Sequence, residues 1–127
     1  MRAVDTNVLV RLITRDDPKQ VTAADTFVER GAWVSHVAVA EATWVLASVY
    51  DCDANAIATA VEMLLSHEHL TIQDSEVVAA AVAQFRQRPR VGFSDCLMVE
   101  VARKAGHLPL GTFDRDLGKV EGAHRLG

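Results

Sequence analysis

Short apolar segments alternate with longer helix-like segments along this chain of 127 residues. Strand character is found at residues 2–5, 32–34, 70–72, 108–111 and 124–126. Helices are predicted at 6–14, 18–30, 37–50, 54–67 and 75–87, and from Ser94 or Asp95 to Gly106. Strands separated by helices predict an α/β fold with three layers, in which a short, mostly parallel, twisted sheet is flanked by helices.

Capping and helix-breaking residues mark several of these boundaries. Ser35 can cap the helix that follows it, and Asp74 or Ser75 can cap the helix at 75–87. Pro89 is expected to stop the helix at 75–87, and Gly106 to end the last one. The helix at 37–50 is apolar on nearly every face, so we expect it to be buried.

Length and composition are those of one compact domain spanning residues 1–127. Half of the residues are hydrophobic, which is enough for a proper core. No apolar run approaches the roughly 20 residues of a membrane span. The sequence begins M-R-A-V-D, and the charge at Asp5 interrupts any apolar run of the kind found in secretory segments. A cytoplasmic protein without membrane contact is therefore expected.

The net charge of −4 and pI near 5.7 argue against a general polyanion binder. Arginine supplies 10 of the 13 basic residues. The densest group is Arg86, Arg88 and Arg90 in R-Q-R-P-R. It is either a solvated helix end or a lip that faces phosphate groups.

Cysteine and histidine give no sign of a zinc or redox site. Cys52 and Cys96 stand alone, so both are expected to be reduced and packed. The five histidines are scattered, and none is a predicted ligand.

Four acidic residues occupy positions that an α/β fold would bring together. They are Asp5 in V-D-T-N, Glu41 in V-A-V-A-E-A-T-W-V-L, Asp95 in G-F-S-D-C and Asp114 in T-F-D-R-D. Ligands of parallel sheets bind beyond the carboxyl ends of the strands, where helix N-termini also point. All four acids are therefore predicted at one edge of the sheet. Glu41 is the most telling, because a carboxylate among apolar neighbours is costly unless something binds it.

Each acid also has a structural alternative. Asp5 could cap the helix that begins at Thr6, and Asp95 could cap the last long helix. Asp114 could form an Asx-turn, and Glu41 could pair with a buried arginine. Taken jointly, these alternatives require four coincidences at one edge of the sheet, so a divalent metal site is favoured.

Oxygen ligands without suitably spaced histidines favour Mg²⁺ or Mn²⁺. In such a site Asp5, Asp95 and Asp114 would hold metal, and Glu41 would hold water or act as a base. This chemistry suits phosphodiester hydrolysis. Thr6, Asn7 and Thr112 lie beside the acids in the sequence and could orient ligands and water.

The ordered motifs resemble a known family. They are A-V-D-T-N-V-L-V-R at the start, S-x-x-x-x-x-E from Ser35 to Glu41, F-S-D-C-L where F-x-D-A-L is common, and T-F-D-R-D-L near the end. Together they look like a PIN domain over essentially the whole chain. Within that family they are most similar to the VapC toxins of bacterial toxin-antitoxin pairs.

The resemblance implies an endoribonuclease dependent on Mg²⁺ or Mn²⁺ that cuts structured RNA and is inhibited by a cognate antitoxin. Carried over by position, the acidic quartet is Asp5, Glu41, Asp95 and Asp114. Thr112 and Asp116 are lesser members, and Asn7 lies beside them. A homodimer is also implied. The acidic net charge leaves the RNA-binding surface unexplained.

Other classes of protein fit the sequence less well. A PIN nuclease that processes RNA without an antitoxin, or a non-catalytic PIN scaffold, would share the fold. A phosphoryl-accepting receiver domain needs a lysine after a late strand, and none of Lys19, Lys104 and Lys119 follows a strand. A haloacid-dehalogenase-type phosphatase would begin with D-x-D, whereas Asp5 is followed by Thr6 and Asn7.

Overall fold

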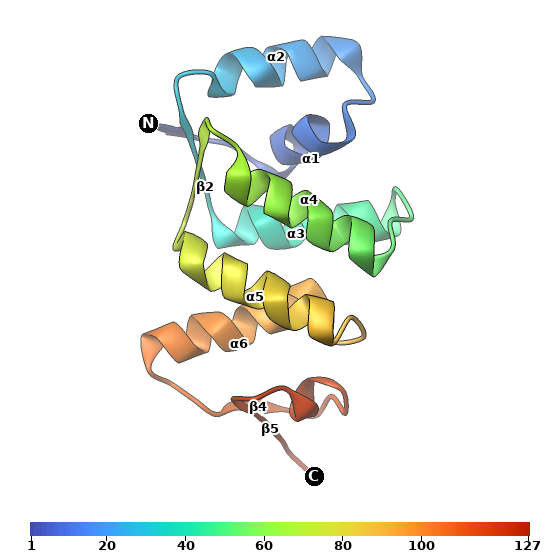
Figure 1. Ribbon diagram of the computed structural model, residues 1–127, viewed down its shortest axis with the longest axis vertical. Coiled ribbons are helices and arrows are strands. Elements are labelled where there is room, and N and C mark those ends of the chain that lie inside the picture. The colour runs from blue at the N-terminus through green and yellow to red at the C-terminus, as the bar shows by residue number, and fades with distance from the viewer. The chain divides into compact units, whose positions relative to one another are not determined.

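The computed structural model describes residues 1–127 as a mixed α/β protein with six α-helices and short parallel strands (Figure 1). Its contacts divide the chain into two compact units. The N-terminal unit is Met1–Ser75 and the C-terminal unit is Glu76–Gly127. None of the helices is both long and apolar enough to cross a membrane.

The N-terminal unit is built around a three-stranded parallel sheet in the order β1-β2-β3. Its elements are β1 (Arg2–Ala3), α1 (Thr6–Thr14), α2 (Pro18–Val28), β2 (Ala32–Val34), α3 (His36–Ser48), α4 (Ala54–Ser66) and β3 (Leu70–Ile72). Because each strand pair is connected through helices, the strands run parallel, as the sequence predicts. The predicted α/β fold class is confirmed.

The register of the sheet aligns the carboxyl ends of its strands. Ala3 pairs with Trp33, and Trp33 pairs with Thr71. The Val4 amide adds a 3.1 Å hydrogen bond to the carbonyl of Trp33, although the strand ends before Val4. The first strand is thus shorter than the predicted 2–5, because Asp5 already belongs to the start of α1.

Four helices of this unit begin with a capping side chain. Asp5, Asp17, Ser35 and Asp53 each accept a hydrogen bond from the backbone amide three residues later, at 2.8–3.1 Å. A cap of this kind contributes about 1 kcal/mol. The predicted capping role of Ser35 is confirmed.

Helix ends differ from the predictions by one or two residues. The structure ends α2 at Val28 rather than residue 30, places α3 at His36–Ser48 rather than 37–50, and ends α4 at Ser66 rather than residue 67. Terminal turns fray, and sequence patterns do not fix them.

Helix α3 buries only one of its faces. Ala42, Thr43 and Leu46 are buried, whereas Val37 and Trp44 are each 67% exposed. The prediction that this helix is buried therefore holds for that one face only. An apolar sequence shows that a helix can be buried, but the elements that pack against it decide which side is covered.

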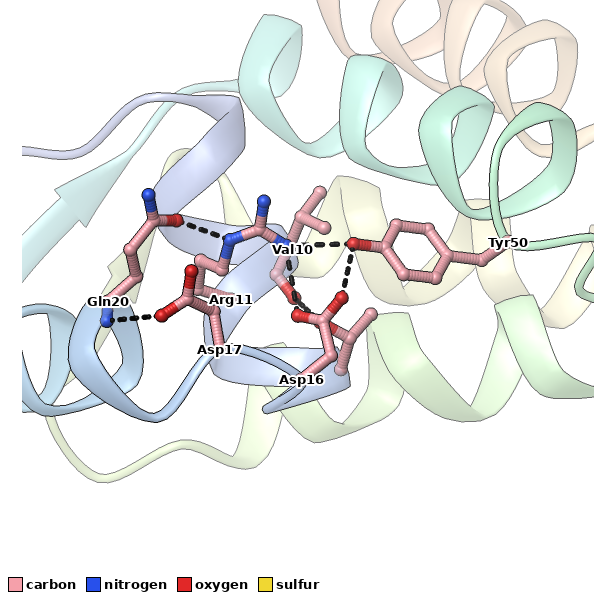
Figure 2. A network of polar contacts seen from close by, with 7 residues as sticks. Val10, Arg11, Asp16, Asp17, Gln20 and Tyr50 are labelled. Atoms are coloured by element: carbon pink, nitrogen blue, oxygen red, sulfur yellow. Dashed lines mark hydrogen bonds and ion pairs between the residues drawn. The ribbon is translucent and has the colours of Figure 1, made fainter.

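A polar network joins α1, the loop before α2, and the residue Tyr50 that follows α3 (Figure 2). Arg11 donates to the Tyr50 hydroxyl at 2.8 Å and to Asp16 at 3.0 Å. The Tyr50 hydroxyl donates to the other Asp16 oxygen at 2.9 Å, and Arg11 Nε donates to Gln20 at 2.5 Å. Residues far apart in the sequence are therefore fixed to one another at this end of α1.

The C-terminal unit contains two long helices and a second, smaller sheet. Its elements are α5 (Ser75–Gln87, whose first residue closes the N-terminal unit), α6 (Phe93–Ala105), β4 (Leu110–Thr112), the 3-10 turn η1 (Leu117–Lys119) and β5 (Ala123–Arg125). Strands β4 and β5 pair in parallel with each other. The rings of Phe85 and Phe93 pack edge to face, with centroids 6.3 Å apart, between α5 and α6.

The late strands correct one prediction. They lie at 110–112 and 123–125 rather than 108–111 and 124–126, and they form their own sheet instead of extending the sheet of the N-terminal unit. Asp114 therefore follows a strand of the second sheet rather than a strand of the sheet that Asp5 follows. Three-residue strands have too short a pattern to show which strand they pair with.

Helix α6 begins one residue before its predicted start. Gly92, with φ of 88°, precedes Phe93, and no side chain caps the helix. Gly106 ends it in the left-handed conformation, as predicted, and its amide bonds to the carbonyls of Ala102 and Arg103. Helix α5 ends at Gln87, two residues before Pro89, as predicted.

Candidate active site

The carboxyl ends of β1 and β2 border an open cavity of about 500 Å³ in the N-terminal unit. The residues that line it come from the start of α1 and the first half of α3. They are Val4, Asp5, Thr6, Asn7, Ser35, Val37, Ala38, Glu41 and Val45. Two of the four predicted acids, Asp5 and Glu41, thus face one space, where ligands of parallel sheets bind.

Asp5 has a structural role as well as a place in the cavity. Its Oδ1 accepts the amide of Val8 at 3.1 Å and caps α1. The structural alternative for this residue is therefore real. The cap uses one carboxylate oxygen, so it does not exclude binding through the other.

Glu41 is exposed rather than desolvated. Its Oε2 accepts a hydrogen bond from Thr6 Oγ1 at 3.2 Å. It forms no ion pair, so the alternative of a buried arginine partner is wrong, and so is the argument that burial makes this carboxylate costly. Glu41 instead projects from the open face of α3, and Thr6 steadies one of its oxygens.

Asp95 and Asp114 interact with each other in the C-terminal unit. Burial raises the pKa of the half-buried Asp95 above its ordinary value of 3.8, and the negative charge of Asp114 raises it further. Asp95 lies in the first turn of α6, where no side chain caps the helix, so its predicted alternative as a cap is wrong. An uncompensated pair of carboxylates is a place where a cation would be stabilising.

Asp114 organises the turn that follows β4. Its Oδ1 accepts the Leu117 amide at 2.9 Å, and its own amide donates to Thr112 Oγ1 at 3.0 Å. The Asx-turn predicted as its structural alternative is not formed, because the bond runs to the amide three residues on rather than two. Asp116 stands just before η1, and its side chain makes no capping bond.

The donor atoms of these groups suit a hard divalent cation. In each unit taken separately, no three His, Cys, Asp or Glu side chains gather closely enough to hold a metal ion. The N-terminal unit offers Asp5, Glu41 and the hydroxyl of Thr6, and the C-terminal unit offers Asp95 and Asp114. All are oxygen donors, which fits Mg²⁺ or Mn²⁺ better than zinc.

The remaining predicted groups are at the surface or are inert. Arg86, Arg88 and Arg90 are exposed around the end of α5. Both cysteines are free, as predicted. Burial, and then the charges of Asp95 and Glu100, raise the pKa of the Cys96 thiol to about 11, so this thiol stays protonated and unreactive.

Sequence reasoning missed two features near the cavity. Asn7 lines a second cleft of about 360 Å³ between α1 and α2, together with Arg11, Gln20, Phe27 and their neighbours. Trp44 is exposed one helical turn beyond Glu41. The spacing of Glu41 and Trp44 was a usable signal for the second feature, because residues three apart on a helix are neighbours.

The fold and its acids define an α/β protein with carboxylates beyond the ends of short parallel strands. The PIN domain family model matches residues 2–123, and the chain belongs to this family. PIN domains are generally nucleases and typically bind a divalent metal, so membership supports a hydrolase. Neither the curated proteins nor the solved structures gave a match.

Proposed function

We propose that this protein is an endoribonuclease that uses Mg²⁺ or Mn²⁺ to hydrolyse phosphodiester bonds of RNA, and that it is the toxin of a VapBC-type toxin-antitoxin pair. The observation that carries the proposal is the open cavity at the ends of β1 and β2, where Asp5 and Glu41 face one space in a chain of the PIN domain family. The mutual repulsion of Asp95 and Asp114 adds support, because a cation would relieve it.

The proposed catalytic set is Asp5, Glu41, Asp95 and Asp114. The three aspartates would hold the cation, which would polarise the phosphoryl group and lower the pKa of water. Glu41 takes a proton from the attacking water as a general base, and the bond from Thr6 orients it. Hydrogen bonds donated by Asn7 and Thr112, and hydrogen bonds accepted by the carboxylate of Asp116, would support these groups.

The partners follow from the same proposal. The substrate is RNA, and the exposed Arg86, Arg88 and Arg90 are suited to contact its phosphates. A cognate antitoxin would inhibit the toxin, the toxin would form a homodimer, and it would act in the cytoplasm. Sedimentation of the purified protein tests the homodimer directly.

Cleavage of total cellular RNA tests the activity. Purified protein is incubated with Mn²⁺, with Mg²⁺ and with EDTA, and the Asp95→Asn variant is prepared alongside to exclude a contaminating nuclease. Discrete fragments that need metal and are absent with the variant are expected. Sequencing the fragment ends then identifies the target.

The Asp53→Asn variant is the matched control. Asp53 is also an aspartate beside a helix start, but it caps α4 and belongs to no predicted site. It should cut RNA like the unmodified chain. A folded protein that binds Mn²⁺ and cuts no RNA would contradict the nuclease, and would favour a non-catalytic scaffold. Expression in a bacterial host tests the toxin role, because growth should stop unless the antitoxin is present.

A further inference from the structure

Trp44 exposes an unusually large apolar surface beside the acidic cavity. Its side chain is 67% exposed, although tryptophan is the largest side chain and loses most by contact with water. The protein's other tryptophan, Trp33, is 38% exposed on β2. Tryptophan is enriched at binding interfaces, because its ring system is a large apolar surface with one polar N–H group.

Helical register relates this side chain to the cavity. Val37, Glu41 and Trp44 follow one another at spacings of four and three residues, so they share one face of α3. Val37 and Glu41 line the cavity. Side chains three residues apart on a helix have Cβ atoms about 5–6 Å apart, which is within the span of a single nucleotide. Trp44 therefore extends the rim of the cavity by one helical turn.

We infer that Trp44 is a stacking platform for a nucleobase of single-stranded RNA whose phosphate lies at the cavity of Asp5 and Glu41. The inference rests on the proposed function and adds a substrate contact to it. An indole ring accepts any base, because every base has a flat π-face. The platform would thus hold an unpaired nucleotide next to the cut without reading its identity by hydrogen bonds.

The position of Glu41 argues for RNA rather than a protein partner on this face. A protein surface that covered both Val37 and Trp44 would also cover Glu41, which lies between them and forms no ion pair. Burying that carboxylate without a cation is costly, and charged residues are depleted from the cores of protein interfaces. A base stacked on Trp44 leaves Glu41 open to the cavity.

Tryptophan fluorescence tests the contact in the full-length chain. The Trp33→Phe variant leaves Trp44 as the single tryptophan, since the chain has two. A short single-stranded oligoribonucleotide with a fluorescent end label is titrated in the presence of Ca²⁺. Like Mg²⁺, Ca²⁺ is a hard cation that binds oxygen ligands. Quenching of the Trp44 emission is expected in step with binding. Label anisotropy should show Trp44→Ala binding about 10- to 100-fold more weakly, with Trp44→Phe between the two.

Met63→Ala is the matched control. Met63 is 51% exposed on α4 and lines no described cavity, so its truncation removes an exposed apolar side chain of the same unit. This variant should bind the oligonucleotide like the unmodified chain. If Met63→Ala and Trp44→Ala weakened oligonucleotide binding equally, the inference would be overturned. The effect would then come from the loss of any exposed apolar side chain and not from stacking on Trp44.

The outcomes separate this inference from the proposed function. Normal cleavage and normal oligonucleotide binding by Trp44→Ala would overturn the stacking role and leave the nuclease intact. A third outcome would assign this face of α3 to a second copy of the chain. In that case the Trp44 emission would change with protein concentration alone, and Trp44→Ala would convert a dimer into a monomer in sedimentation. Failure of every variant to bind or cut RNA would overturn both.

Discussion

Asp5 combines a cap of α1 with a place in the cavity, and two substitutions at this position separate the roles. Asparagine caps helices as well as aspartate does, so Asp5→Asn should keep the fold and lose the charge. We expect its cleavage activity to fall by roughly a hundredfold or more. Asp5→Ala should lose the activity and also about 1 kcal/mol of unfolding free energy. Denaturant melts and RNA cleavage measure the two effects.

The matched pair for this test is Asp53→Asn and Asp53→Ala, because Asp53 makes the same capping bond at the start of α4. Its alanine variant should lose similar stability and keep full activity. Unfolding of Asp5→Asn would mean that the charge of Asp5 serves the structure.

Removing the charge of Asp95 should raise the stability of the fold and abolish cleavage. Burial and the charge of Asp114 raise its pKa, so the folded protein binds this proton more tightly than the unfolded chain does. Stability from Asp95 is thus greatest at low pH and falls as the pH rises through the unfolded and then the folded pKa. In EDTA at neutral pH, Asp95→Asn should melt at a higher temperature than the unmodified chain while its cleavage is lost. An equal or lower melting temperature would show that the charged carboxylate is stabilised in the folded state.

At this scale the sequence identified the acids but not their surroundings. Asp5 and Glu41 could be placed near one another because both follow parallel strands. The exposure of Glu41 could not be predicted, because its apolar neighbours Val37 and Trp44 point to solvent rather than into a core. Burial depends on which elements cover a helix face, and local sequence does not contain that information.

Helices and the first sheet could be predicted closely from the sequence. Periodicity and caps gave α1 at Thr6–Thr14, β2 at Ala32–Val34 and β3 at Leu70–Ile72 with the observed bounds. The pairing of β4 with β5 could not be predicted. Both strands have three residues, so their hydrophobic pattern is compatible with more than one neighbour.

The network around Arg11 should stabilise the N-terminal unit at neutral pH and lose this contribution in acid. The pKa of Asp16 lies below its ordinary 3.8, first because of the hydrogen bond from Thr14 and then because of the bond from Tyr50. A lowered carboxyl pKa contributes stability that is present above the unfolded pKa and is lost as the pH falls through the folded one. Tyr50→Phe removes one of these bonds, so it should melt at a lower temperature at neutral pH.

The difference between Tyr50→Phe and the unmodified chain should shrink as the pH falls below 3.8, when Asp16 becomes protonated. Thermal melts at several pH values measure this convergence. A difference that stays constant down to the lowest pH would show that the hydroxyl stabilises the fold without Asp16.

The whole molecule is still predicted to be one domain. The family match at residues 2–123 extends over both compact units, Met1–Ser75 and Glu76–Gly127. Each unit alone is small for an independent core. Calorimetry should therefore show a single unfolding transition whose calorimetric and van't Hoff enthalpies agree.

Two separate transitions would mean that the units fold independently and that a PIN domain can be divided at this point. The same scan of Asp5→Ala then tells which transition contains α1. A single transition shifted as a whole would support the prediction of one domain.

Tyr50 is the only tyrosine of the chain, and its hydroxyl lies in the network of Arg11 and Asp16 (Figure 2). Incorporating fluorotyrosine throughout the protein would therefore introduce fluorine at one known place. Its single ¹⁹F resonance would report on the junction of α1, the loop before α2, and the end of α3. The chain thus carries its own spectroscopic label, next to the helix whose first turn borders the acidic cavity.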